Sequence, residues 1–238
     1  MTKSYVLQKP EYTVALYGPS KERVRSIPVK HGANKNKICL LKAASNETHR
    51  GFTEMSAPKF GNWFSNDFDL FADGTTLTES RSSVVVQTAG CNLLSLYERT
   101  THSLSVSHVG RPALTPRNKI GEPIINMVTK AYQQLVFGVK NPEVEAYITG
   151  GVCSKHFLHD RPEAKHLIEP FDQFGELAFT DRETGALDIQ RIIIYQLLEL
   201  GVKEYKIETD GLCTKEEPWL TNYRDDTVSR NVVVFVLH

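Results

Sequence analysis

Three short runs rich in Val, Leu, Ser and Tyr follow one another between residues 83 and 107, and they constrain the fold more than any other feature. They span residues 83–87, 92–97 and 103–107. Each run has the length of a strand and is bounded by turn residues. Strand-like runs separated by short turns are typical of antiparallel pairing. The sequence therefore predicts a β-meander in this part of the chain.

Helices and further strands follow the meander. Residues 118–137 carry apolar side chains at spacings of mostly three or four, which predicts an amphipathic helix. A second helix is predicted to begin after Asp188 as N-cap and to end before Gly201. Three more strands are predicted, at residues 144–149, 202–208 and 231–237.

The N-terminal part is harder to interpret. It holds short strand-like pieces at 12–17 and 38–41 among basic, turn-rich segments, and we expect edge strands and loops there. No internal repeat or low-complexity linker divides the chain. We therefore predict a single α/β domain of the α+β type over residues 1–238, with a mostly antiparallel central β-system flanked by helices.

Composition limits the classes of partner. The chain has 238 residues, of which 40% are hydrophobic, enough for a real core. Its 28 basic residues balance 28 acidic ones, so we expect neither nucleic acid nor an anionic membrane as partner. No apolar run approaches the roughly 20 residues of a membrane span, and the N-terminus lacks the apolar region of a signal peptide. We expect a cytoplasmic protein and make no prediction of its oligomeric state.

Cys91 stands on a Thr-Ala-Gly-Cys corner between two of the strand-like runs. His108 follows 17 residues later, at the far end of the next strand pair. Two strands joined by a tight turn at residues 98–101 would bring the two side chains together. Such a pair suits a nucleophilic thiolate activated by an imidazole, and equally a zinc site. Coincidence is the third interpretation.

We expect structural or solvent-exposed roles for the other cysteines and for the histidine-rich segment. Cys39, Cys153 and Cys213 form no C-x-x-C pair, and we expect Cys153 to pack in the core and Cys213 to be structural. The spacing of His156, His159 and His166 would suit one helical face, but Pro162 would interrupt that helix. We therefore expect three solvated histidines.

Several motifs, in the same order, resemble the laccase-domain family, also called the multicopper polyphenol oxidase or purine nucleoside phosphorylase family. Residues 72–91 resemble its Ala-Asp-x(n)-Thr-Ala-Asp-Cys segment, and residues 108–111 resemble its His-Ala-Gly-Trp-Arg-Gly. Residues 148–153 stand where the family has Gly-Pro-x-Ile-Gly-Pro-Cys. Residues 187–207 resemble its long helix and following strand, and residues 213–230 its Cys-Thr, Tyr-Arg-Arg, Gly-Arg ending. The resemblance covers residues 72–238, and residues 1–60 are a divergent N-terminal part.

The resemblance implies a laccase-domain sandwich and a purine nucleoside phosphorylase or deaminase that acts on a small nucleoside and phosphate. Cys91 and His108 would be its catalytic residues or zinc ligands. The residues that would surround the nucleoside or phosphate are Arg111, Tyr223, Arg224 and Arg230. The family's third ligand, a Gln-Val-His histidine, has no counterpart at residues 54–59. His49 is the nearest replacement, so we expect weaker zinc binding than is usual in the family.

A second departure from the family keeps two alternatives open. Gly90 replaces the family's aspartate before the cysteine, and the resulting Ala-Gly-Cys resembles the Ser-Gly-Cys of the cytotoxic necrotizing factor deamidase toxins. Those toxins share the architecture and use a Cys–His pair without metal. One alternative is therefore a metal-independent thiol hydrolase or glutamine deamidase. The other is a catalytically degenerate binding module.

Overall fold

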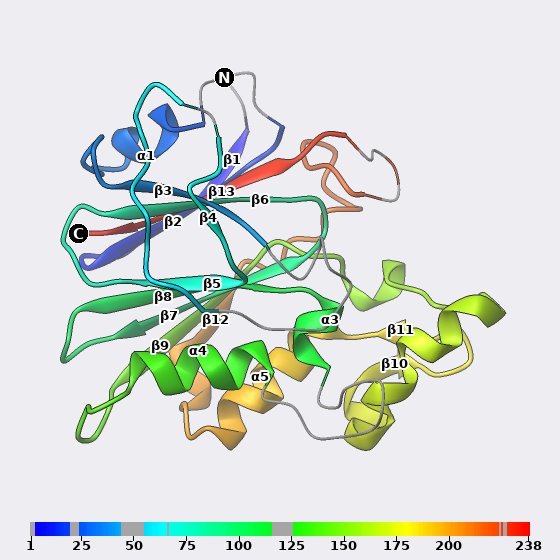
Figure 1. The fold of residues 1–238 in the computed structure, drawn as a ribbon. Coiled ribbons are helices and arrows are strands. Elements are labelled where there is room, and N and C mark those ends of the chain that lie inside the picture. The colour runs from blue at the N-terminus through cyan, green and yellow to red at the C-terminus, as the bar shows by residue number, and fades with distance from the viewer. Residues whose placement is uncertain are drawn as a thin grey trace.

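The strands form two large sheets that pack face to face, with helices on the outside (Figure 1). This computed structural model describes residues 3–19, 24–43, 55–65, 67–115, 126–223, 225 and 228–238. The fold is a mixed α/β fold, and most of the strand pairs are antiparallel. None of the helices in these ranges has the length and apolar character that crossing a membrane requires.

The first sheet has six strands in the order β1-β2-β13-β6-β3-β4. Their bounds are β1 Ser4–Gln8, β2 Tyr12–Tyr17, β3 Ile38–Lys42, β4 Leu70–Phe71, β6 Ser83–Thr88 and β13 Asn231–Leu237. β13 lies between β2 and β6 and is buried along its whole length, as its continuous apolar run requires of a central strand. The C-terminal strand is therefore the centre of this sheet.

The second sheet has five strands in the order β12-β9-β7-β8-β5. Their bounds are β5 Gly74–Leu77, β7 Asn92–Glu98, β8 Ser103–Val109, β9 Val144–Thr149 and β12 Ile207–Thr209. β7 and β8 form the predicted hairpin, and every residue of both strands is buried. A separate two-stranded sheet pairs β10 (Phe179–Asp181) with β11 (Ala186–Leu187).

Helices cover the outer faces. The α-helices are α1 Ser26–Lys30, α3 Arg111–Leu114, α4 Met127–Leu135 and α5 Ile189–Glu199, and the 3₁₀-helices are η1 Ser154–His156, η2 Pro162–Leu167, η3 Glu169–Leu177 and η4 Glu204–Lys206. Figure 1 shows α4 and α5 against the second sheet and α1 beside the first. Three apolar clusters fill the spaces between these layers. One lies between the sheets, and the others lie under α4 and α5 and under α1.

Several predicted elements need correction. The strand over 12–17 is not an edge strand, because β2 pairs with both β1 and β13, and β3 likewise pairs with β4 and β6. The strand predicted over 202–208 is shorter, because η4 precedes β12. Of the helix predicted over 118–137, the described part is α4, and residues 116–125 lie outside the described ranges.

Candidate active site and a neighbouring Cys-His cluster

Cys91 and His108 stand together at the open end of the β7–β8 hairpin. Leu93 pairs with His108 in the register of that hairpin. Cys91 is two positions before Leu93, so it is on the same face and diagonal to His108. A Cβ built on Gly110 would lie 3.2 Å from the Cys91 Sγ and 3.0 Å from the His108 Cε1. The structure thus brings the two predicted side chains side by side.

The corner that carries Cys91 crosses from one sheet to the other, because β6 belongs to the first sheet and β7 to the second. Thr88 fixes this corner: its hydroxyl donates to the Cys91 carbonyl at 3.1 Å and accepts from the Cys91 N–H at 3.2 Å. Gly90 has a φ of +114°, which favours glycine, and a Cβ there would lie 2.7 Å from the Asn222 Nδ2. The small-residue sequence therefore permits both the turn and this close approach.

His108 is buried behind the thiol. Its backbone N–H donates to the Asp73 carbonyl at 2.7 Å, but neither ring nitrogen finds a well-formed hydrogen bond among the described residues. Burial acts to lower the pKa of His108, but the Cys91 and Asp73 charges outweigh it and raise that pKa. Burial acts to raise the pKa of Cys91, but His108, Arg111 and Arg230 outweigh it and lower that pKa. Both shifts favour the form of the pair in which Cys91 is a thiolate and His108 an imidazolium.

A cavity of about 420 Å³ opens at the thiol, and a smaller one of about 40 Å³ adjoins it. Both are lined by Gly90, Cys91, Val152 and Phe157. The larger cavity is also lined by Gln87, Thr88, Ala89, Asn222, Tyr223 and Arg230. Its volume falls in the range of small-molecule sites, roughly 300–1,000 Å³. Cys91 thus faces a space that can hold a ligand the size of a nucleoside.

The predicted arginines surround this space in different ways. Arg111 lines the smaller cavity, and its Nη1 lies 2.8 Å from the His159 Nε2. The His159 Nδ1 lies 3.1 Å from the Gly185 carbonyl, so Nδ1 carries the proton and Nε2 accepts from Arg111. The Arg230 guanidinium stands 5.9 Å from the Tyr223 ring centre at the larger cavity. Arg224 and His49 lie outside the described residues.

Sequence reasoning missed three residues of this neighbourhood. Asn222 is buried and donates to the Thr214 hydroxyl at 3.0 Å. Asp73 is buried, and its charge acts on His108. It is the aspartate of the Ala-Asp pair that opens the 72–91 segment, so the family motif could have identified it. The expectation of three solvated histidines was wrong for His159, which is 3% exposed and bonded to Arg111.

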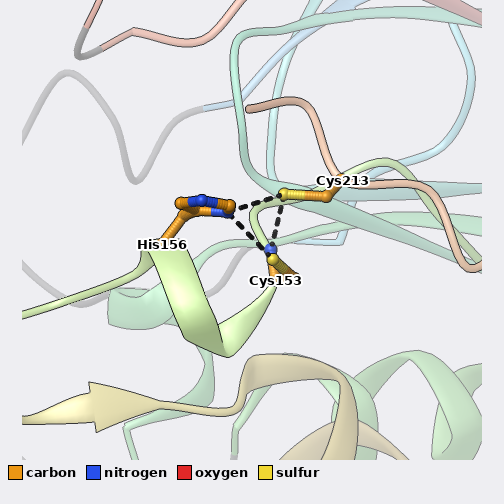
Figure 2. A group of neighbouring side chains, drawn as sticks. All are labelled: Cys153, His156 and Cys213. Atoms are coloured by element: carbon orange, nitrogen blue, oxygen red, sulfur yellow. Dashed lines mark hydrogen bonds between the residues drawn. The ribbon is translucent and has the colours of Figure 1, made fainter. Parts of the chain in front are cut away.

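A second cluster joins Cys153, His156 and Cys213 (Figure 2). The His156 Nδ1 lies 3.3 Å from the Cys153 Sγ and 3.7 Å from the Cys213 Sγ. Cys153 is half-buried, not packed in the core as expected, and His156 is only partly exposed. The three ligand atoms lie within 4.8 Å of one another, so this Cys₂His group could bind a metal ion.

Comparisons with known proteins agree with the fold. A family model described as "Multi-copper polyphenol oxidoreductase laccase" matches residues 27–237. Among solved structures, the Bacillus licheniformis hypothetical protein YfiH is 15% identical with a TM-score of 0.73, over 95% of this chain and 93% of that one. YlmD from Geobacillus stearothermophilus is 13% identical with a TM-score of 0.73, over 96% and 93%.

The Neisseria meningitidis protein NMB0706 is 14% identical with a TM-score of 0.68, over 98% of both chains. No curated protein matches the chain. At these identities the solved structures show a shared fold.

Proposed function

The chain belongs to the family described as multi-copper polyphenol oxidoreductase laccase, the laccase-domain family, and from this premise we propose that it is an enzyme of the purine nucleoside phosphorylase or deaminase type. The single observation that carries the proposal is the position of Cys91, which lines a cavity of nucleoside size beside two arginines. Cys91 and His108 are the proposed catalytic residues. Arg111, Tyr223, Arg224 and Arg230 are the proposed contacts to phosphate or nucleoside.

The residues present do not support a multi-copper mechanism. Within the described ranges, the one group of three metal-ligating side chains is Cys153, His156 and Cys213, whereas several copper ions need several such groups. Of the ligands expected at the other site, the described residues include Cys91 and His108, fewer than the three of an ordinary zinc site, and His49 lies outside the described residues. In the proposed reaction the chain's own side chains bind the substrates and move the proton.

Phosphorolysis moves the ribose C1′ from the purine N9 to a phosphate oxygen. The C1′–N9 bond breaks, its electron pair stays on N9, which takes up a proton, and a C1′–O bond forms. Guanidinium groups at Arg111 and Arg230 suit an incoming phosphate because Arg makes bidentate bonds to oxyanions. The Cys91–His108 pair would hold a proton beside the cavity, which Cys91 lines and behind which His108 is buried.

The test is to incubate the protein with adenosine and phosphate and to separate the products by chromatography. We expect phosphate-dependent release of adenine, or inosine and hypoxanthine where deamination occurs. Cys91→Ser and His108→Asn should each lower kcat by about 100-fold or more, the usual contribution of a proton-transferring group. The control is His166→Ala, which changes an exposed histidine away from the cavity. Absence of all these products at high enzyme concentration would remove the proposal.

Arg230 tests the phosphate site separately. Arg230→Gln removes a charge-assisted hydrogen bond, so the KM for phosphate should rise by about 10- to 100-fold. Arg182→Gln is the matched control, because Arg182 is an exposed arginine whose ion pairs, with Asp172 and Glu176, lie away from this cavity. An unchanged KM in the Arg230 variant would exclude Arg230 from phosphate binding.

A thiol hydrolase or glutamine deamidase is the second candidate, and the lowered pKa of Cys91 beside His108 favours it. In that reaction the Cys91 sulfur attacks an amide carbon, and ammonia leaves before water releases the acid. Ammonia release from glutamine-containing peptides, lost in Cys91→Ser, would support this candidate. If both reactions are absent and the protein still binds adenosine, a binding module is the remaining interpretation.

A further inference from the structure

We propose that Cys153, His156 and Cys213 form a zinc site that is separate from the Cys91–His108 pair. The three side chains converge from two loops that are about 60 residues apart in the sequence (Figure 2). The sulfur of Cys91 belongs to the hairpin end, whereas these ligands follow β9 and β12. This zinc site would form whether or not the protein catalyses the reaction proposed above.

The spacing of the ligand atoms suits a tetrahedral ion. Zn–S bonds of about 2.3 Å and Zn–N bonds of about 2.0–2.1 Å at tetrahedral angles place N and S roughly 3.6 Å apart. The His156 Nδ1 lies 3.3 Å from one sulfur and 3.7 Å from the other. Two thiolates and one imidazole also form a donor set that zinc prefers over hard cations such as Mg²⁺. Three protein ligands leave a fourth position open.

Strand pairing and backbone hydrogen bonds hold the three ligands in this arrangement. The parallel pairing of β12 with β9 puts the loops after both strands at the same edge of the sheet. The Thr214 N–H donates to the Gly151 carbonyl at 2.9 Å, which fixes one loop on the other. The Cys153 N–H donates to the Cys213 Sγ at 3.2 Å, a contact of the kind that orients a thiolate ligand.

The surroundings favour a cation and let it enter. The Glu216 Oε1 lies 3.6 Å from the His156 Nδ1 and adds negative charge beside the ligands. The side chain of His156 is 27% exposed, so an ion can reach the site from solvent. Cys213 is buried and forms the inner wall.

A bound ion would stabilise one wall of the larger cavity. Val152 and Phe157 flank the ligand segment, and both line that cavity. Thr214, next to Cys213, accepts from Asn222, which lines the cavity as well. The ion would therefore tie together the two loops that carry these residues, which is a structural role.

The experiment uses the full chain, stripped with a chelator under reducing conditions and then titrated with Zn²⁺ in competition with a chromogenic chelator. Co²⁺ serves as a spectroscopic probe, because thiolate-to-cobalt absorption reports cysteine ligands. We expect the protein to bind one equivalent of metal tightly. The spectrum of the Co²⁺ form should show absorption from thiolate ligands. His156→Ala and Cys213→Ser should each weaken metal binding by about 100-fold or more. Losing a residue that only hydrogen-bonds a ligand already costs about 10- to 100-fold, and these variants lose the ligand itself.

Matched variants separate this site from the other cysteines. Cys39→Ser and His166→Ala should leave the affinity and the Co²⁺ spectrum unchanged, and so should the double variant Cys91→Ala/His108→Ala. A Co²⁺ thiolate spectrum that disappears in the Cys91 variant and persists in His156→Ala would overturn the proposal. Failure of the reduced protein to bind either metal, or a Cys153–Cys213 disulfide that persists after reduction, would overturn it too.

Loss of metal binding in His156→Ala can be distinguished from loss of folding. His156 is partly exposed, so its replacement by alanine leaves the core packing intact, and circular dichroism checks this directly. Should Cys213→Ser fail to fold, the Co²⁺ spectra of the unmodified protein and of His156→Ala decide between the two outcomes.

Discussion

Cys91 and His108 change each other's acidity because they are close and partly removed from water. The thiolate raises the pKa of His108, and the imidazolium lowers the pKa of Cys91 in spite of burial. Each charge thus stabilises the other, and the charged pair is favoured over the neutral one compared with a separate thiol and imidazole. Above the imidazole pKa the pair loses its positive charge, and below the thiol pKa it loses its nucleophile.

The first prediction concerns alkylation of the chelator-treated protein. Cys91 should react with iodoacetamide with a midpoint below the ordinary thiol pKa of about 8.5. Cys39 should react much more slowly, because burial raises its pKa to about 11. Peptide mass spectrometry as a function of pH measures both rates. In His108→Asn the midpoint for Cys91 should move upward, and an unchanged midpoint would show that the imidazole does not activate the thiol.

Gly110 tests whether the contact itself matters. A Cβ at this position would press on both members of the pair, at 3.2 Å from the Cys91 Sγ and 3.0 Å from the His108 Cε1. Gly110→Ala should therefore separate them and slow alkylation of Cys91 at neutral pH. Gly138→Ala is the control for an added methyl group, because a Cβ there meets nothing within 4 Å. Its φ of +76° strains alanine, so circular dichroism first checks that this variant is folded. Equal alkylation rates in the Gly110 variant and the unmodified protein would mean that the pair tolerates the added methyl.

At the scale of elements, one buried ion pair ties the start of α1 to the first sheet. Arg25 donates to both carboxylate oxygens of Asp69, at 2.7 and 2.8 Å, and to the Ile38 carbonyl at 3.0 Å. Asp69 also accepts from the Leu40 N–H at 2.7 Å. The pair therefore connects α1, β3 and the segment before β4.

Asp69→Asn should cost about 3–5 kcal/mol of unfolding free energy, because it leaves the fully buried Arg25 guanidinium without its counter-charge. Urea unfolding followed by circular dichroism measures the loss. Asp67→Asn changes an exposed carboxylate nearby and should cost less than about 1 kcal/mol. A loss in Asp69→Asn no larger than that of the control would show that water replaces the carboxylate without penalty.

The elements that could be predicted from the sequence are those whose signals are local. β13 begins and ends as predicted, because 231–237 is one continuous apolar run. In α5 the Asp188 carboxylate accepts from the Arg191 N–H at 3.0 Å, and Gly201 follows the C-cap with a φ of +87°. Both caps are local chemistry, so the helix was predicted almost to the residue.

Features that depend on distant partners could not be predicted in this way. β2 is an interior strand because β13 pairs with it from the other end of the chain. Cys153 and Cys213 meet only because β12 pairs in parallel with β9, and no local pattern specifies that pairing. The Cys91–His108 pair was accessible to prediction since a single hairpin brings it together.

At the scale of the whole molecule, a charged cluster joins the two sheets at the end away from Cys91. Glu145 is the second residue of β9, and its Oε1 accepts from Arg99 at 2.7 Å and from Lys206 at 2.8 Å. Its Oε2 lies 3.3 Å from the Nζ of Lys9, which follows β1 in the other sheet and also bonds Glu208. Glu145 is therefore the centre of an electrostatic contact between the sheets.

This contact predicts how stability depends on acid. Burial acts to raise the pKa of Glu145, but the bonds from Lys206 and Arg99 outweigh it and lower the pKa to about 2. A glutamate in an unfolded chain has a pKa of about 4.3. Between pH 4.3 and 2, roughly, the folded state therefore binds fewer protons than the unfolded state and loses stability as the pH falls. The contribution is fully present above about pH 4.3 and disappears as the pH approaches 2.

Glu145→Gln removes this contribution, so it should lower the unfolding free energy at pH 7 by about 1–2 kcal/mol, after allowance for screening at the partly exposed cations. Urea unfolding at a series of pH values measures the difference between variant and unmodified protein. That difference should shrink as the pH falls below about 4. Glu208→Gln, at a more exposed carboxylate, should change stability by less than about 1 kcal/mol at any pH. A difference for Glu145→Gln that stays constant down to pH of about 3 would mean that packing, and not charge, joins the two sheets at this end.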